Sequence, residues 1–185
     1  MKDTFDKQES STQNEKITSN KNTNIIAMEK VKTVEIKEIA WPGKTFIMKR
    51  ATLGFDKLSQ FFPEAYKNIY SALHKSGINP VDPPYAIYFN VDAEKKETDL
   101  GAAVAVPELA TIPKEFALVT IPASKALLYT HYGSYEHMAD AYGELDKYVM
   151  KNHLKKAWVL EQYFSDPVQE PNPEKWKTNI YYILK

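Results

Sequence analysis

The chain has 185 residues, of which 43% are hydrophobic and 12% aromatic, which is enough for one well-packed core and too little for two ordinary ones. Lysine and arginine total 24 and aspartate and glutamate also total 24, so the sequence lacks the basic stripe of a nucleic-acid-binding protein, and direct nucleic-acid binding is not expected. The absence of cysteine excludes disulfides, thiolate metal sites and cysteine nucleophiles. No segment approaches the roughly 18 apolar residues of a membrane span, and no signal peptide is evident. These features predict a soluble, cytoplasmic protein.

The first 32 residues differ in composition from the rest of the chain. They are rich in Ser, Thr, Asn, Gln, Lys and Glu, and only the cluster Ile25-Ile26-Ala27-Met28 is apolar. Such a segment buries too little apolar surface to offset the entropy lost on ordering. We therefore expect a disordered polar tail over residues 1–32 and a folded domain over residues 33–185.

The first half of the domain reads as strand, helix, strand, strand, with two segments in the first strand region. Alternating apolar residues over 34–39 and 45–50 predict strands, with a turn at Pro42-Gly43. A helix is expected from Phe55 to about His74, because apolar residues recur with helical spacing. They are Leu58, Phe61, Phe62, Ala65, Ile69 and Leu73. Pro63 is unfavourable inside a helix and suggests that the main helix begins near Glu64. Strands are then predicted over 85–91 and 102–106.

The second half repeats this plan. Strands are predicted over 116–121 and 125–132, a helix over 135–152 with Ser134 as its N-cap, and strands over 158–164 and 178–184. The apolar face of this second helix is formed by Met138, Ala141, Tyr142, Leu145 and Val149. Each lies 80 positions after an apolar residue of the first helix, from Leu58 to Ile69, which indicates an internal duplication.

The duplication predicts an α+β fold. Two strand-helix-strand-strand units would pair about a pseudo-twofold axis, with antiparallel sheets and one main helix per half, because each unit alone leaves sheet surface uncovered. Such pairing favours a central ligand cleft at the junction of the halves.

Three segments of the second half resemble a known family. They are residues 132–136 (YGSYE), 161–167 (EQYFSDP) and 176–182 (WKTNIYY). Together with the duplication they are similar to the GyrI-like, or bacterial transcription activator effector-binding, domain, over roughly Val34 to Lys185. That family includes multidrug-sensing transcription regulators, a gyrase inhibitor, stand-alone domains and hydrolases of cyclopropane-containing compounds.

The resemblance implies a cleft lined by aromatic rings with one acidic residue near its base, at the position of Glu161. Its own sequence context agrees, because Glu161 lies in a predicted central strand, where an unpaired carboxylate is costly. Its counterpart in the first half is Ala86, so the structural plan requires no charge there. A solvent-facing Glu161, or one paired with a lysine, is the alternative.

Aromatic residues complete the expected ligand site. Tyr163 shares a strand face with Glu161 by alternation, and Tyr88 is its counterpart in the first half. Ring faces attract cations, so a carboxylate among such rings suits a cationic or amphipathic small molecule. The candidate ligand-binding residues are Glu161, Tyr163, Tyr88, Tyr132, Tyr129, Tyr181 and Trp158. Alternation does not distinguish Tyr181 from Tyr182, and core packing is the alternative role for each ring.

Other chemistry has little support in the sequence. The four histidines lack the spacing of metal ligands, and no phosphate-binding loop or G-x-S-x-G motif is present, so no metal, cofactor or catalytic residue is assigned. We expect a stand-alone domain that senses or sequesters an effector or xenobiotic. Its N-terminal segment is too short and polar for a helix-turn-helix, so transcription regulation would need a partner chain. A hydrolase using the same cleft, or an inhibitor of a protein such as DNA gyrase, are the alternatives, and a protein partner or a homodimer is left open.

Overall fold

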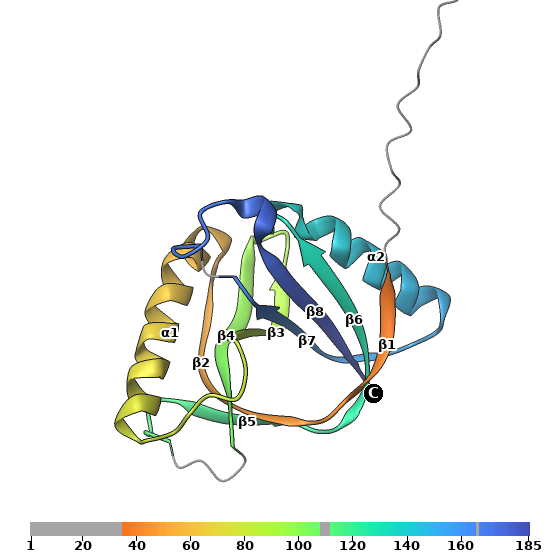
Figure 1. Ribbon diagram of the computed structural model, residues 1–185. Coiled ribbons are helices and arrows are strands. Elements are labelled where there is room, and N and C mark those ends of the chain that lie inside the picture. The colour runs from red at the N-terminus through yellow and green to blue at the C-terminus, as the bar shows by residue number, and fades with distance from the viewer. Residues whose placement is uncertain (1–34, 108–111, 166) are drawn as a thin grey trace, which may run out of the picture. The chain divides into compact units, whose positions relative to one another are not determined.

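A computed structural model describes residues 35–107, 112–165 and 167–185 (Figure 1). The expected disordered tail over residues 1–32 lies outside these ranges. The described residues form eight strands and two α-helices. The strands are β1 (Ile36–Trp41), β2 (Lys44–Gly54), β3 (Tyr85–Asp92), β4 (Glu97–Val106), β5 (Ala117–Ile121), β6 (Ser124–Tyr132), β7 (Lys156–Tyr163) and β8 (Lys177–Leu184). The helices are α1 (Leu58–Lys75) and α2 (Met138–Lys151), each preceded by a short 3-10 turn.

The strands join into one curled antiparallel sheet with the order β1-β6-β8-β7-β3-β4-β2-β5. Replacing each strand by its counterpart in the other half (β1 by β5, β2 by β6, β3 by β7, β4 by β8) gives the same order in reverse, so the predicted duplication and α+β class are confirmed. Each half has two strands before its helix, one more than the expected strand-helix-strand-strand unit. The halves meet at β3 and β7, where Ala86 lies directly opposite its own counterpart Glu161. The pseudo-twofold axis therefore passes between these two residues.

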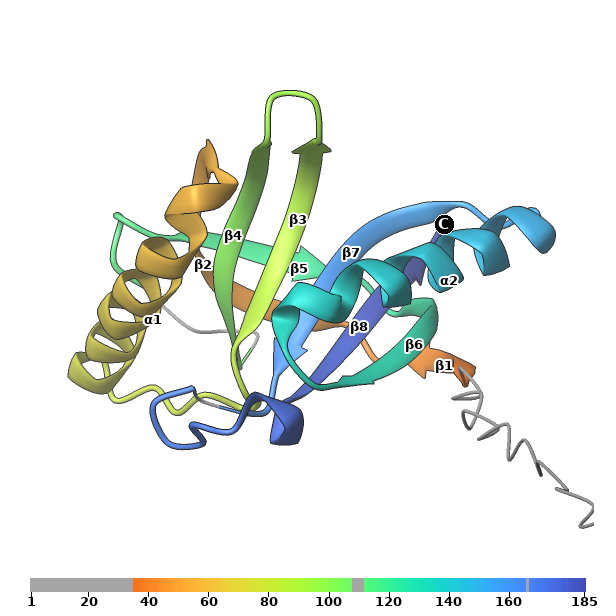
Figure 2. The same ribbon diagram turned by 90° about the horizontal axis from the view of Figure 1, so that it is seen from above.

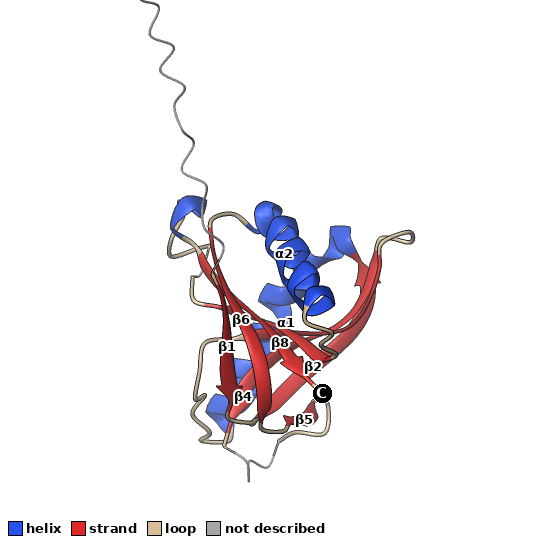
Figure 3. Cartoon of the chain, turned by 90° about the vertical axis from the view of Figure 1, so that its right-hand side faces the viewer, coloured by secondary structure: helices blue, strands red, loops and turns tan. Residues whose placement is uncertain are grey.

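Both helices cover the same face of the sheet (Figures 2 and 3). α1 packs on β2 and β4 around the buried Ile47, Ile69 and Val104, and α2 packs on β6 and β8 around Leu145 and Tyr182. We call this the helix face. The opposite face holds a third apolar cluster inside the curl of the sheet. Each half thus supplies one helix to a shared surface, at whose centre lie β3 and β7.

Pro63 does not break the first helix, contrary to expectation. α1 begins at Leu58 and continues through Pro63 to Lys75. The missing N–H and the bulk of the proline ring act on the carbonyl four residues earlier, which belongs to the exposed Ser59 in the first turn. The cost of the proline therefore falls at the solvated beginning of the helix. Ser134 has its predicted capping role, since its hydroxyl accepts a hydrogen bond from the Glu136 N–H.

The sheet curls where β1 continues into β2 and β5 continues into β6. Gly43 at the first of these bends has a φ of +79°, and a Cβ there would lie 2.9 Å from the backbone nitrogen of Ala123 at the second bend. We expect Gly43→Ala to lower the free energy of unfolding by about 1–3 kcal/mol, because it combines left-handed backbone strain with a backbone clash.

Substitutions of two other glycines distinguish the effect of backbone strain from that of the backbone clash. Gly77 also has a positive φ, of +65°, but nothing lies within 4 Å of its hypothetical Cβ, and Gly143 in α2 has open space and no positive φ. In chemical denaturation, Gly77→Ala should cost less than Gly43→Ala, and Gly143→Ala should stabilise by roughly 0.5–1 kcal/mol. Equal losses of unfolding free energy for Gly43→Ala and Gly77→Ala would show that the close approach of Gly43 to the Ala123 backbone does not matter for stability.

Candidate functional site

The carboxylate of Glu161 lies at the centre of the helix face. The Glu161 side chain is 5% exposed and accepts hydrogen bonds from three tyrosine hydroxyls. Tyr88 donates to Oε2 at 3.0 Å, Tyr163 donates to the same oxygen, and Tyr142 donates to Oε1. Both carboxylate oxygens are thereby satisfied by neutral donors, as a buried acceptor requires.

The duplication explains how these hydroxyls converge. Tyr88 on β3 and Tyr163 on β7 are counterparts in the two halves, so they approach the axial carboxylate from either side of the pseudo-twofold axis. Tyr142 comes from α2 and has Phe62 on α1 as its counterpart, which has no hydroxyl. The site therefore combines a symmetric pair of tyrosines with one donor that only the second half provides.

Burial dominates the electrostatics of this cluster. It raises the pKa of Glu161 above its usual value, although the hydroxyls of Tyr142, Tyr163 and Tyr88 and the nearby His131 each act to lower it. Burial also raises the pKa of all three tyrosines, and the negative charge of Glu161 adds to that effect. The tyrosines therefore keep their protons and act as donors. In the described part of the chain, no lysine or arginine forms an ion pair with Glu161.

The raised pKa of Glu161 predicts a pH-dependent stability. A carboxyl that binds its proton more tightly in the folded state stabilises the fold below the unfolded pKa of about 4.3, and this contribution is lost as the pH rises through the folded value. Glu161→Gln cannot ionise. We expect its free energy of unfolding, relative to that of the unsubstituted protein, to rise from pH 4 towards neutral pH. A constant difference in urea titrations across this range would contradict the raised pKa.

Four further aromatic rings extend from the tyrosine cluster: Phe62 and Tyr66 on α1, Tyr135 in the turn before α2 and Trp176 before β8. Phe62 and Tyr135 both pack edge-on against Tyr163, with ring centroids 6.0 and 5.7 Å away. Tyr66 stacks on Phe62, and Trp176 lies 4.8 Å from Tyr135. These rings connect the buried carboxylate to the surface, where Tyr135 is exposed.

The structure brings three of the seven predicted site residues together and separates the others. Glu161, Tyr163 and Tyr88 form the cluster, and Tyr129 lies on the same face but two strands away, opposite Ile180. Three predicted residues lie elsewhere: Tyr181 and Trp158 pack in the cluster on the opposite face, and Tyr132 is 56% exposed at the end of β6. Successive residues of a strand point to opposite faces of the sheet. Alternation therefore does not show which face carries the site, and this becomes clear only from the face on which the two helices pack. Tyr182, which could not be distinguished from Tyr181, is on the helix face and packs on Tyr142.

Tyr142 is the main contact that the sequence did not reveal. Its helical spacing placed it among apolar core positions, and its ring does lie on the buried side of α2. The available signal was the comparison between the halves, because a hydroxyl replaces the bare ring of Phe62 at the equivalent position. A polar atom added at a core position usually has a partner.

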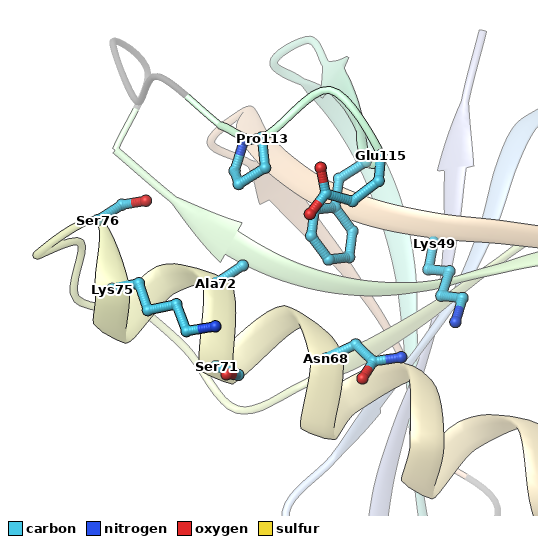
Figure 4. A pocket seen from close by; sticks show the side chains of 9 residues that line it. Lys49, Asn68, Ser71, Ala72, Lys75, Ser76, Pro113 and Glu115 are labelled. Carbon is cyan, nitrogen blue, oxygen red and sulfur yellow. The ribbon is translucent and has the colours of Figure 1, made fainter.

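A separate groove of about 400 Å³ lies between α1 and the segment before β5 (Figure 4). Its walls combine polar and apolar side chains, with Lys49, Lys75 and Glu115 contributing charges. None of the predicted ligand-binding residues lines it. Across the described ranges, no group of three or more His, Asp or Glu side chains could hold a metal ion, and no helix there has the length and apolar character needed to cross a bilayer.

Comparison with known families identifies the class of protein that this fold and site define. The model of the GyrI-like small molecule binding domain matches residues 33–185. The chain therefore belongs to the GyrI-like small-molecule-binding family. A comparison with curated proteins finds no match to this sequence.

Solved structures share the fold at low sequence identity. EcmrR in a complex with DNA is 19% identical with a TM-score of 0.74, over 85% of this chain and 59% of EcmrR. The chain thus spans less than two thirds of that protein, and it matches 98% of the isolated EcmrR C-terminal domain with a TM-score of 0.71, at 19% identity over 83% of this chain. The fold is also similar to that of a hydrolase from Listeria innocua, with 16% identity over 82% of this chain and 92% of the other and a TM-score of 0.57. SAV2435 bound to tetraphenylphosphonium is 16% identical over 82% of this chain and 94% of the other, with a TM-score of 0.61.

Proposed function

We propose that this domain binds a lipophilic organic cation at Glu161 and so senses or sequesters an effector or xenobiotic. The observation that carries the proposal is a nearly fully buried carboxylate whose donors in the described structure are all neutral tyrosine hydroxyls. Burying a negative charge without a cationic partner is costly. A bound cation would supply the missing charge, which the fold leaves uncompensated.

The surrounding rings favour an aromatic or amphipathic cation. The faces of Tyr88, Tyr142 and Tyr163 offer attraction to positive charge that bulk water does not compete with, while Phe62 and Tyr135 add apolar surface. SAV2435, which shares the fold, was solved with tetraphenylphosphonium, a cation of this class. Tetraphenylphosphonium is therefore the first probe, and isothermal calorimetry with the chain tests the proposal directly.

Hydrolysis is the second candidate function. The observation that favours it is the contact of the Glu161 carboxylate with the hydroxyls of Tyr142 and Tyr163, because a carboxylate can take a proton from water while a hydroxyl donates one to a leaving group. A protein of the same fold is described as a hydrolase. The raised pKa of both tyrosines makes them weak acids, which favours binding over turnover.

Product analysis separates the two functions. The chain is incubated with a reactive cyclopropane-containing electrophile, and ring-opened product is followed by mass spectrometry. A hydrolase would form product that Glu161→Gln abolishes while binding persists, whereas a binding domain would return the compound unchanged at every enzyme concentration.

A further inference from the structure

The polar residues of the site come almost entirely from the second half of the duplication. Glu161 faces Ala86, Tyr142 corresponds to Phe62, and the same asymmetry continues on the neighbouring strands. Thr178 lies opposite Tyr163 just as Leu100 lies opposite Tyr88. His131 lies opposite Thr178 just as Ala51 lies opposite Leu100. The first half shows that this architecture folds with apolar residues at these positions.

Thr178 has a buried hydroxyl for which the described residues provide no hydrogen-bond partner. Its side chain is fully buried, and its Oγ1 has no hydrogen-bond partner among the described residues. An unsatisfied buried polar group costs about 1–3 kcal/mol, and the leucine at the equivalent position 100 avoids that cost. The hydroxyl is therefore unfavourable for the fold alone.

The position of this hydroxyl connects it to the carboxylate. Residues that lie directly opposite each other in an antiparallel pair point to the same face, so Thr178 lies on the helix face beside Tyr163. Glu161 is its diagonal neighbour on the adjacent strand. The Cα atoms of such neighbours are roughly 7–8 Å apart, a distance that a small molecule can span. The His131 ring on its other side is held by a 3.0 Å contact between Nε2 and the Ser134 carbonyl. Because a carbonyl oxygen only accepts, Nε2 is the donor.

We infer that Thr178 is a specificity-determining residue, whose hydroxyl pairs with a neutral oxygen of the ligand, such as a hydroxyl, ether or carbonyl, while Glu161 holds the cationic centre. This inference rests on the proposed function. It defines the ligand class more narrowly, as an organic cation that carries a hydrogen-bonding oxygen near the charge.

Matched phosphonium ions test the inference. Tetraphenylphosphonium has no hydrogen-bonding group, whereas the ortho, meta and para isomers of (hydroxyphenyl)triphenylphosphonium add one hydroxyl to the same cation. The unsubstituted protein should bind at least one isomer about 3- to 10-fold more tightly than tetraphenylphosphonium, the gain of one hydrogen bond. Thr178→Val should lose this preference and keep its affinity for tetraphenylphosphonium, and Thr178→Ser should retain the preference.

Thr98 provides the control, because it is also buried but its hydroxyl donates to the Asn90 carbonyl at 2.9 Å. Thr98→Val should lose stability and keep the preference, whereas Thr178→Val should melt at the same or a higher temperature. The inference is overturned if tetraphenylphosphonium binds through Glu161 but no isomer is preferred, or if Thr178→Val still prefers one. Binding of tetraphenylphosphonium that is unaffected by Glu161→Gln, or no binding of any phosphonium, would instead refute the proposed function and this inference with it.

Discussion

Glu161→Gln is expected to weaken binding of tetraphenylphosphonium by about 10- to 150-fold, from a loss of roughly 1.5–3 kcal/mol. The substitution preserves the size of the side chain and its hydrogen-bonding capacity and removes only the charge. Because the carboxylate is 5% exposed, its attraction to a cation is poorly screened by water and salt. Calorimetry at neutral pH measures the loss, and folding should be preserved because no cationic side chain is left unpaired.

Two controls separate a local charge from other effects. Triphenylphosphine oxide has a similar shape without the net charge, so its affinity should change by no more than about twofold. Glu136→Gln removes the same charge from an exposed position in the turn before α2, and solvent screening should make its effect small. Equal affinity of the unsubstituted protein and Glu161→Gln for every cation that binds would reject Glu161 as the charge partner.

The largest effects on stability are expected from substitutions on the buried sides of the two helices. Ile69 on α1 and Leu145 on α2 are fully buried against the sheet. Ile69→Ala and Leu145→Ala should each lower the free energy of unfolding by about 2–5 kcal/mol, because the lost apolar contacts leave a cavity in a close-packed layer. Urea denaturation followed by circular dichroism measures both losses.

Met150 serves as the matched control on α2, since its side chain is 76% exposed. Met150→Ala removes apolar atoms that are already in water, so its effect should lie within about 0.5 kcal/mol. A loss at Leu145 no greater than that at Met150 would mean that α2 does not pack on the sheet through the face described above.

The fold could be predicted well because its signals are local and periodic. Helical spacing from Leu58 to Leu73, its repetition 80 residues later, and alternation in the strands correspond to α1, α2 and all eight strands. The largest differences are that β4 begins at Glu97 rather than at residue 102 and that β2 ends at Gly54 rather than at residue 50. What local pattern could not show is that the halves join through β3 and β7 into one continuous sheet.

The site was predicted in part, again from alternation within a strand and from the duplication. Glu161 and Tyr163 share a face by alternation within one strand, and the duplication added Tyr88. Tyr142 was not recognised, because its contact joins a helix to a strand that follows it in the chain, and helical spacing at a buried position is equally typical of ordinary core packing.

The sequence alone therefore determined the duplication, the element order, the family and the residues that alternate onto a common face with Glu161. Tertiary structure decided which face of the sheet both helices cover, and so assigned Tyr182 to the helix face and Tyr181 and Trp158 to the opposite one. It also showed that Thr178 has no partner in the described structure. The physical reason is that periodicity reports burial along one element, whereas the pairing of hydroxyls with a carboxylate depends on how separate elements pack together.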